Sequence, residues 1–242
     1  MKLNLSLVRA KIFLILAIIL FSTGAYSQNK KPVSFKVLNK DNSFISFSLG
    51  MGANYGNNPS LIEFMEGDID FYETAAPDQQ FSTFDVGLEF FSGIELQLAR
   101  NVSVKGQYSF LTKSYNLSQF PNYDYSYINH QPYIIINYII PDDHSFIKLG
   151  GGVGYLISDF TAKRFGSENK YSSTGVGLMG EALLNLQISS NVGGYISGYM
   201  FKTFMDDLEA PTGALLLNDN GGTVNLSSFG VGFRLGMEIF IF

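Results

Sequence analysis

Residues 227–242 read SSFGVGFRLGMEIFIF, and the alternation in this stretch decides the fold class. Large apolar side chains occupy every second position, at Phe229, Val231, Phe233, Leu235, Met237, Ile239 and Ile241. Between them lie three glycines, one base (Arg234), one acid (Glu238) and the aromatic Phe240. Because a strand turns successive side chains to opposite faces, the stretch predicts a strand with one apolar face and one small, charged face.

The length of this strand and the position of its charges favour a membrane barrel. At about 3.4 Å per residue, residues 229–241 can cross a hydrocarbon layer ~30 Å thick even when tilted. A charge facing lipid near the midplane of a transmembrane barrel costs about 2–4 kcal/mol. Arg234 and Glu238 should therefore face a closed lumen, and the apolar face should contact lipid. A soluble barrel with its apolar face inward is the alternative for this strand taken alone.

The composition suits one all-β domain and excludes several classes of function. The 242 residues include 22 Phe, 14 Tyr and 25 Gly, which is typical of many strands joined by turns. The chain has no Cys, so disulfides and thiolate chemistry are excluded. A net charge of −5 offers no basic surface for nucleic acid. No cofactor and no metal site are predicted.

The first residues resemble a targeting segment. Lys2, Arg9 and Lys11 precede an apolar run at 12–21, and Ala25-Tyr26-Ser27 fits a small-x-small cleavage pattern. We predict a signal peptide at 1–27, a flexible periplasmic leader at 28–43 and a barrel at 44–242. Only helices and closed barrels satisfy their backbone hydrogen bonds in lipid, and no later apolar run has the length of a membrane helix.

The rest of the chain repeats the pattern of the last strand. Alternation predicts about eight strands, near residues 44–55, 81–98, 102–110, 131–140, 145–157, 174–188, 192–204 and 229–242. Four long connections, at 56–80, 114–129, 158–173 and 205–226, alternate with three short turns, as in outer-membrane barrels. We predict an all-β, transmembrane, eight-stranded antiparallel up-and-down barrel. The faces of the fourth and seventh strands stay undetermined.

Four short stretches carry a resemblance to a known family: Ala25–Gln28, Phe47–Gly52 (FSLGMG), Gly150–Tyr155 (GGGVGY) and Gly230–Gly236 (GVGFRLG). In them the chain resembles small eight-stranded outer-membrane barrels of the OmpA-like or OmpX-like kind, and in detail the PorT-like outer membrane protein beta-barrel domain proteins of Bacteroidota. The resemblance implies the outer membrane of a Gram-negative bacterium and lipid around the barrel. It also implies recognition by the barrel assembly machinery, with Phe240 and Phe242 as the assembly signal.

Eight charged residues fall on the predicted inner face: Asp85, Glu89, Glu95, Lys105, Lys148, Glu181, Arg234 and Glu238. An eight-stranded barrel is just wide enough for side chains to fill it. These charges are therefore expected to pair as a structural plug. The alternatives are a gated or narrow ion path and a proton-relay or catalytic role.

The predicted loops hold the remaining candidates. Tyr115, Phe120, Tyr123, Tyr125 and Tyr127 predict either an interfacial aromatic girdle with self-packing of the loop or a partner surface for a protein or glycan. The acidic first and fourth loops are expected to be solvated; binding of divalent cations or repulsion of polyanions is the alternative.

Only two histidines occur in the chain, His130 and His144, and they fall at opposite ends of the barrel, so they cannot share a metal. His130 has Asp124 and Ser126 nearby in sequence, without a recognisable catalytic motif.

These observations predict a non-enzymatic outer-membrane barrel, structural or adhesive, or an accessory subunit of a surface or secretion assembly. A small channel is the first alternative, and a lipid-modifying enzyme that uses His130 is the second. Other outer-membrane or surface proteins are the expected partners.

Overall fold

A computed structural model of the chain describes residues 44–70, 85–117, 123–142, 145–164, 166–189 and 191–241. The predicted signal peptide (1–27) and leader (28–43) lie outside the described residues, as do Phe120, His144 and Phe242. All the described residues belong to one compact unit, Phe35–Phe242. Within them, no helix is both long and apolar enough to cross a lipid bilayer.

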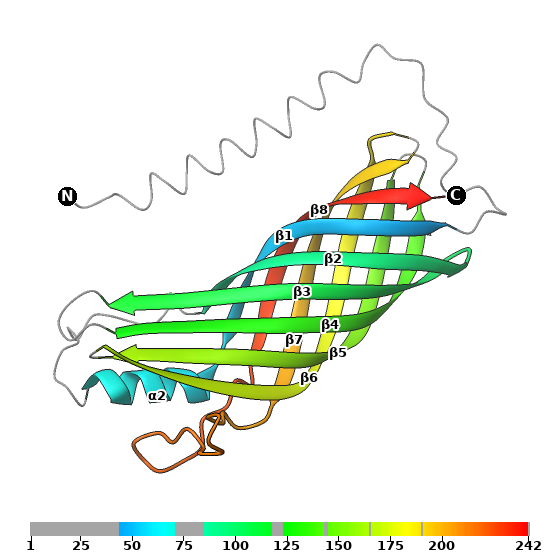
Figure 1. Cartoon of the computed structure of the whole chain (residues 1–242). Helices are drawn as coiled ribbons and strands as arrows, with labels where there is room; N and C mark the ends of the chain where they lie inside the picture. Colours follow the sequence, from blue (N-terminus) through cyan, green and yellow to red (C-terminus); the bar gives the residue numbers. More distant parts are fainter. Residues whose placement is uncertain are drawn as a thin grey trace, which may run out of the picture. The chain divides into compact units, whose positions relative to one another are not determined.

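Eight antiparallel strands close into a barrel in the order β1-β2-β3-β4-β5-β6-β7-β8 (Figure 1), which confirms the predicted architecture. The elements are β1 (Ile45–Asn57), α2 (Pro59–Asp70), β2 (Val86–Ala99), β3 (Val102–Leu117), β4 (Tyr123–Pro141), β5 (Ser145–Arg164), β6 (Ser167–Gln187), β7 (Val192–Met205) and β8 (Phe229–Ile241). The ring closes where β1 pairs with β8, from Ile45↔Ile241 to Asn57↔Phe229.

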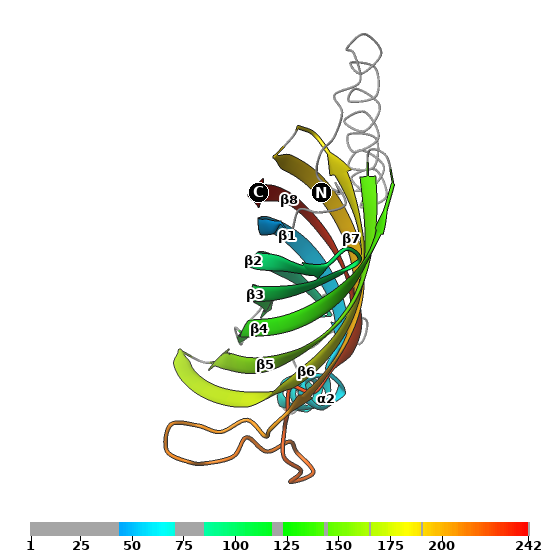
Figure 2. The same ribbon diagram turned by 90° about the vertical axis from the view of Figure 1, so that its right-hand side faces the viewer.

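The two ends of the barrel differ. The short connections β2–β3, β4–β5 and β6–β7 lie at one end, which we call the turn end. At the other end, β3 to β6 project past their neighbours, and α2 and residues 206–228 lie there too (Figures 1 and 2). We call α2, the projecting ends of β3–β6 and residues 206–228 together the cap.

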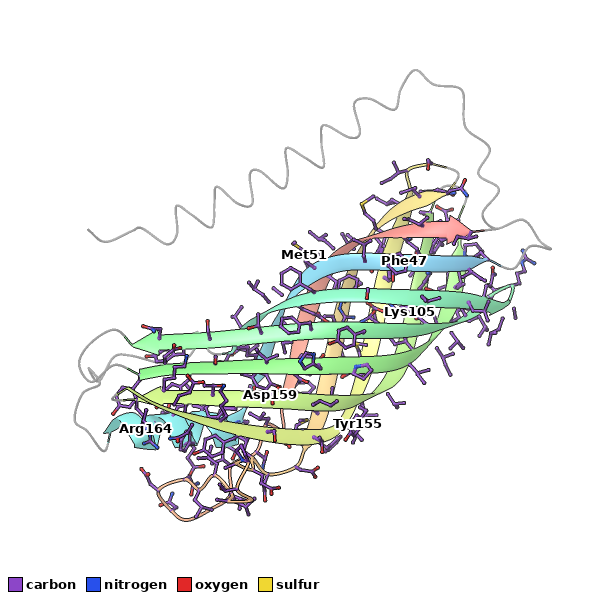
Figure 3. All side chains as sticks on the ribbon, viewed as in Figure 1. Phe47, Met51, Lys105, Tyr155, Asp159 and Arg164 are labelled. Atoms are coloured by element: carbon purple, nitrogen blue, oxygen red, sulfur yellow. The ribbon has the colours of Figure 1, made fainter. Side chains whose placement is uncertain are left out.

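Around the middle of the barrel, the strands turn their charged side chains inward and their large apolar side chains outward, as the cost of a charge facing lipid predicts. Met51 is 59% exposed, whereas Glu238 is 1% exposed. Figure 3 shows Phe47 and Met51 along β1, and Asp159 and Arg164 further along β5 toward the cap. Apolar side chains cover the outside of every strand and form what we call the apolar belt; they include Leu49, Leu88, Ile134, Val153, Leu178, Met200 and Val231.

The two strands whose faces the sequence left undetermined are resolved by the structure. On β4 the inner positions include Tyr133, Ile135 and Ile139, so both faces are apolar and the alternation is hidden. On β7 the inner positions include Tyr195 and Tyr199. Large aromatic side chains point into the lumen on both strands, which the expected pattern of small inner residues does not anticipate.

Two of the four predicted long connections are wrong. Residues 114–129 and 158–173 are mostly strand, because the β3–β4 and β5–β6 hairpins continue well past the apolar belt. Their pairing runs to Leu117↔Tyr123 and Arg164↔Ser167.

The physical reason is a reversal of polarity between the two faces of one strand. Along β5 the exposed positions change from Ile157, in the apolar belt, to Asp159 and Lys163 beyond it. The inward positions become apolar instead, with Phe160 and Ala162 buried. The period of two persists, but a search for apolar-out, polar-in segments ends at the edge of the belt.

Within the first long connection, α2 was not predicted. Pro59 suits the first position of a helix, where no backbone N–H is needed, and the Asn58 carbonyl accepts a hydrogen bond from the N–H of Ile62. Leu61, Phe64 and Met65 are buried on one face at helical spacing. The helical spacing of these three apolar residues is the sequence signal from which α2 could have been predicted.

Candidate functional site

Arg234 on β8 lies at the centre of the lumen and is 1% exposed. Its Nη2 and Nε donate to the two carboxylate oxygens of Glu89 on β2, at 2.6 and 3.0 Å. Its Nη1 donates to Glu181 on β6 at 3.2 Å. The guanidinium also lies over the Tyr199 ring, with Cζ 3.9 Å from the ring centroid. One side chain therefore connects strands on different sides of the barrel.

Lys105 on β3 extends this cluster. Its Nζ donates to Glu181 at 3.1 Å, and the Ser197 hydroxyl donates to the same carboxylate at 2.8 Å. The Tyr199 hydroxyl donates to Glu89 at 2.7 Å. Each carboxylate in the centre of the lumen thus faces a base and a hydroxyl, as burial of a charge requires.

A second ionic cluster lies toward the turn end. Lys148 Nζ donates to Glu95 at 2.7 Å and to Glu238 at 2.8 Å. Asn185 donates to the other Glu238 oxygen at 2.7 Å. Beneath this cluster Phe44, Ile139, Phe146 and Phe240 form a buried apolar group that closes the turn end. Phe240, predicted as part of an assembly signal, is in this group and is 1% exposed.

Seven of the eight charged residues predicted for the lumen lie in these two clusters. The exception is Asp85, which comes just before β2 and uses its backbone carbonyl to accept hydrogen bonds from Gly56 N and Lys113 Nζ. Within the described residues its carboxylate makes none of the ion pairs. Lys113 was missed, although it shares the inward parity of Lys105 on β3.

Small residues in the lumen make room for the aromatic ones. An ideal Cβ on Gly232 would lie 2.2 Å from Cζ of Tyr199, so no larger residue fits there without moving the ring. The Tyr199 ring lies under the guanidinium of Arg234, and its hydroxyl donates a hydrogen bond to Glu89. The glycines of β8 are therefore part of the lumen packing.

The cap has a hydrophobic core of its own. Tyr125 and Phe160 are fully buried, with stacked rings 6.1 Å apart, and they pack in one cluster with Leu61 and Met65 of α2. The same cluster takes in Leu208, Leu216, Val224 and Leu226 from residues 206–228. The wall of β3–β6 and the elements opposite it thus enclose one core, which closes the lumen at this end.

This core decides between the two alternatives for the tyrosines, self-packing and a partner surface. Tyr123 and Tyr125 are fully buried and Tyr127 is 4% exposed, so their rings are not available to a partner. Tyr115 is partly buried and packs against the same core. These tyrosines face inward and pack in the core of the cap. The residues between them on β4, Asp124 and Ser126, are polar and less buried.

Residues 206–228 form a compact fold rather than a loose loop. Three buried residues spaced by eight, Leu208, Leu216 and Val224, bond in a ring through their backbones: Leu208 N to Val224 O, Val224 N to Leu216 O and Leu216 N to Leu208 O, at 2.8–3.0 Å. Gly213 and Gly221, also eight apart, take positive φ angles of 84° and 75° in the two turns. The segment therefore repeats one eight-residue unit.

Lys113 and Asn58 hold the base of the cap together. Lys113 Nζ donates to the Gly56 carbonyl at 3.0 Å and to Asn58 Oδ1 at 3.4 Å. Asn58 Nδ2 donates to the Leu226 carbonyl at 2.9 Å. These contacts tie the entrance of α2 to β3 and to the end of residues 206–228.

His130 does not lie within reach of the residues considered as its catalytic partners. Its Nδ1 is 2.6 Å from the Tyr108 hydroxyl, and its ring packs against Phe110. Asp124 and Ser126 lie on the same strand six and four residues away, which at about 3.3 Å per residue is about 20 and 13 Å. A general base needs direct hydrogen-bond reach. No group of three or more acidic or histidine side chains in the described residues could hold a metal ion.

No protein-family model matches the sequence, and no curated protein matches it significantly. The fold is similar to a major outer membrane protein from Thermus thermophilus, with a TM-score of 0.51 and 12% identity over 81% of this chain and 99% of that chain. Ail, the attachment invasion locus protein of Yersinia pestis, has a TM-score of 0.49 and 12% identity over 82% and 99%. Neisserial surface protein A has a TM-score of 0.45 and 8% identity over 82% and 99%. This chain therefore has the fold of small outer-membrane β-barrels.

Proposed function

We propose that this protein is a non-enzymatic barrel of the Gram-negative outer membrane whose lumen is sealed and whose cap binds partners at the cell surface. Lipid surrounds the apolar belt, and the barrel assembly machinery inserts the chain. The cap serves as an attachment surface or as an accessory subunit of a surface or secretion assembly, as the resemblance to PorT-like proteins suggests.

The observation that carries the proposal is the hydrophobic core of the cap. Long extracellular connections are often only loops, but here α2, the ends of β3–β6 and residues 206–228 enclose buried side chains such as Met65, Tyr125 and Leu216. Ordering so many residues costs conformational entropy, which the burial of apolar area offsets. A rigid surface presented above the membrane is suited to binding, because less freedom is lost on association.

The filled lumen argues against the channel alternative. An eight-stranded barrel is narrow enough for side chains to fill it. Here two ionic clusters, around Arg234 and Lys148, occupy it between the aromatic group at the turn end and the core of the cap. An ion entering the lumen would have to displace buried, paired charges, which is costly.

Two measurements test the proposal. The purified chain, inserted into a planar bilayer, should give no steady conductance above that of the lipid alone. In cells, a photo-crosslinking amino acid in place of Leu215, which is 47% exposed on the cap, should capture other surface or outer-membrane proteins. The matched control replaces Val153, which is 60% exposed in the belt and should contact lipid only. Steady conductance, or equal capture from the two positions, contradicts the proposal.

A further inference from the structure

The outer end of β6 has an unpaired edge within the described residues. On one side β6 pairs with β5 over its whole length, from Arg164↔Ser167 to Ser145↔Leu186. On the other side it pairs with β7 only as far as Gly175↔Met205. Ser172 then continues the sheet by one step, exchanging two backbone hydrogen bonds with Glu209 at 2.9 and 3.0 Å.

The pairing stops at Pro211. In the antiparallel register set by Ser172↔Glu209, the next hydrogen-bonded pair would be Lys170 with Pro211. Proline has no N–H to donate, so it ends a ladder. The chain turns away here, with Ala210 N bonded to Ala214 O and Gly213 N bonded to Ala210 O.

The backbone groups left open can be identified from the period of the strand. Ser172 directs its N–H and C=O away from β5, so Lys170 and Glu168, two and four residues earlier, direct theirs to the same side. No backbone hydrogen bond to Lys170 or Glu168 from that side occurs among the described residues. Two donors and two acceptors therefore lie open in the spacing of a strand.

This edge borders a recess of about 490 Å³, lined by residues 168–171 of β6 and residues 210–212 of the turn. Tyr171, partly buried, lies in the recess, and its ring is 6.4 Å from that of Phe160 in the cap core. Lys163 and Lys170 both pair with Glu168, at 3.3 and 3.1 Å, and hydrogen bonds from Lys170 and Lys163 lower the pKa of Glu168. These three side chains together carry a net charge of +1.

We propose that this edge binds an extended segment of a partner protein by antiparallel β-strand addition along residues 167–170, with one side chain of the segment in the recess beside Tyr171 and Pro211. Alternating backbone donors and acceptors are complementary to another extended backbone. Glu209 already pairs with the same edge in this way, two residues further along. The excess of one base favours an acidic residue in the segment. The inference rests on the proposed function, since it specifies how the cap binds a partner.

The test uses the full chain folded in lipid nanodiscs. The probe is a fluorescent eight-residue peptide of alternating valine and threonine with one central aspartate, and binding is followed by anisotropy. The control peptide has the same sequence with alternate backbone amides methylated, and it should bind at least tenfold more weakly. Equal binding of the two peptides, or no binding of the first, overturns the proposal.

Two variants at one position separate the backbone from the charge. Lys170→Pro removes the open N–H without removing a hydrogen bond to β5 and should weaken binding at least tenfold. Lys170→Thr keeps the N–H and should change binding less than threefold. If both variants lose binding equally, charge and not strand addition explains it, and the proposal fails.

Pro211→Val provides an independent check on the register. It restores the missing donor, so residues 210–212 should pair with β6, slow hydrogen exchange of the Lys170 amide at least tenfold and exclude the peptide. An unchanged exchange rate contradicts the register. The peptide-binding and hydrogen-exchange experiments are independent of bilayer conductance and of crosslinking from Leu215. This inference can therefore fail while the proposed function stands.

Discussion

Replacing Arg234 by Met should destabilise the barrel through one defined carboxylate. The substitution keeps an unbranched side chain of similar length but removes all three hydrogen bonds to Glu89 and Glu181. Glu181 keeps Lys105 and the Ser197 hydroxyl. Among the hydrogen bonds of the described residues, Glu89 keeps only the one from the hydroxyl of Tyr199.

The magnitude follows from the burial of the pair. Arg234 and Glu89 are each 1% exposed, so solvent does not screen their interaction. Removing one partner of a buried ion pair costs about 3–5 kcal/mol, because the other charge stays buried without compensation. Adding Glu89→Gln to Arg234→Met removes that charge and should recover about 2 kcal/mol or more, since a neutral pair is often as stable as the ionic one.

The assay is urea unfolding in lipid vesicles, followed by circular dichroism and by the gel shift of the folded barrel, because the chain has no Trp for fluorescence. The matched control is Leu235→Met, the next residue on β8, which faces outward and should cost under about 1.5 kcal/mol as a volume-conserving change. The reasoning is refuted if Arg234→Met is as stable as the control. It is also refuted if the double variant is less stable than Arg234→Met alone.

Three further substitutions examine other parts of the molecule. Lys148→Met leaves both Glu95 and Glu238 without this base and should cost about 3–5 kcal/mol in the same urea assay; a loss under about 1 kcal/mol would show that the cluster does not depend on it. Leu235→Arg places a charge in the apolar belt and should cost about 2–4 kcal/mol in vesicles, with a much smaller loss in detergent. Tyr125→Ala empties the centre of the cap core, at a local cost of about 3–5 kcal/mol. Proteinase K should then cleave residues 206–228 at least tenfold faster while the gel shift of the barrel is retained, and unchanged cleavage would contradict the packed cap.

The sequence alone was sufficient for the barrel and for much of the lumen. Alternation with a period of two, as from Phe229 to Ile241, is a local property, and the cost of a charge in lipid decides which face turns inward. This places Arg234, Glu181 and Lys148 in one lumen without any knowledge of the contacts between strands. Lys113 follows the same rule and was missed only because its strand was ended too early.

Only the tertiary structure decided the pairing within the lumen and the form of the cap. Arg234 meets Glu89 across 145 positions of sequence because closure of the barrel and the register of β1 between β2 and β8 bring them together. Strand period alone does not fix that register. Beyond the apolar belt the outer face meets water, so the face rule reverses. Tyr125 is therefore buried, where the sequence left both self-packing and a partner surface open. The local sequence pattern shows that side chains alternate between two faces. Which of the two faces is apolar depends on where the segment lies relative to lipid, water and a second layer of structure.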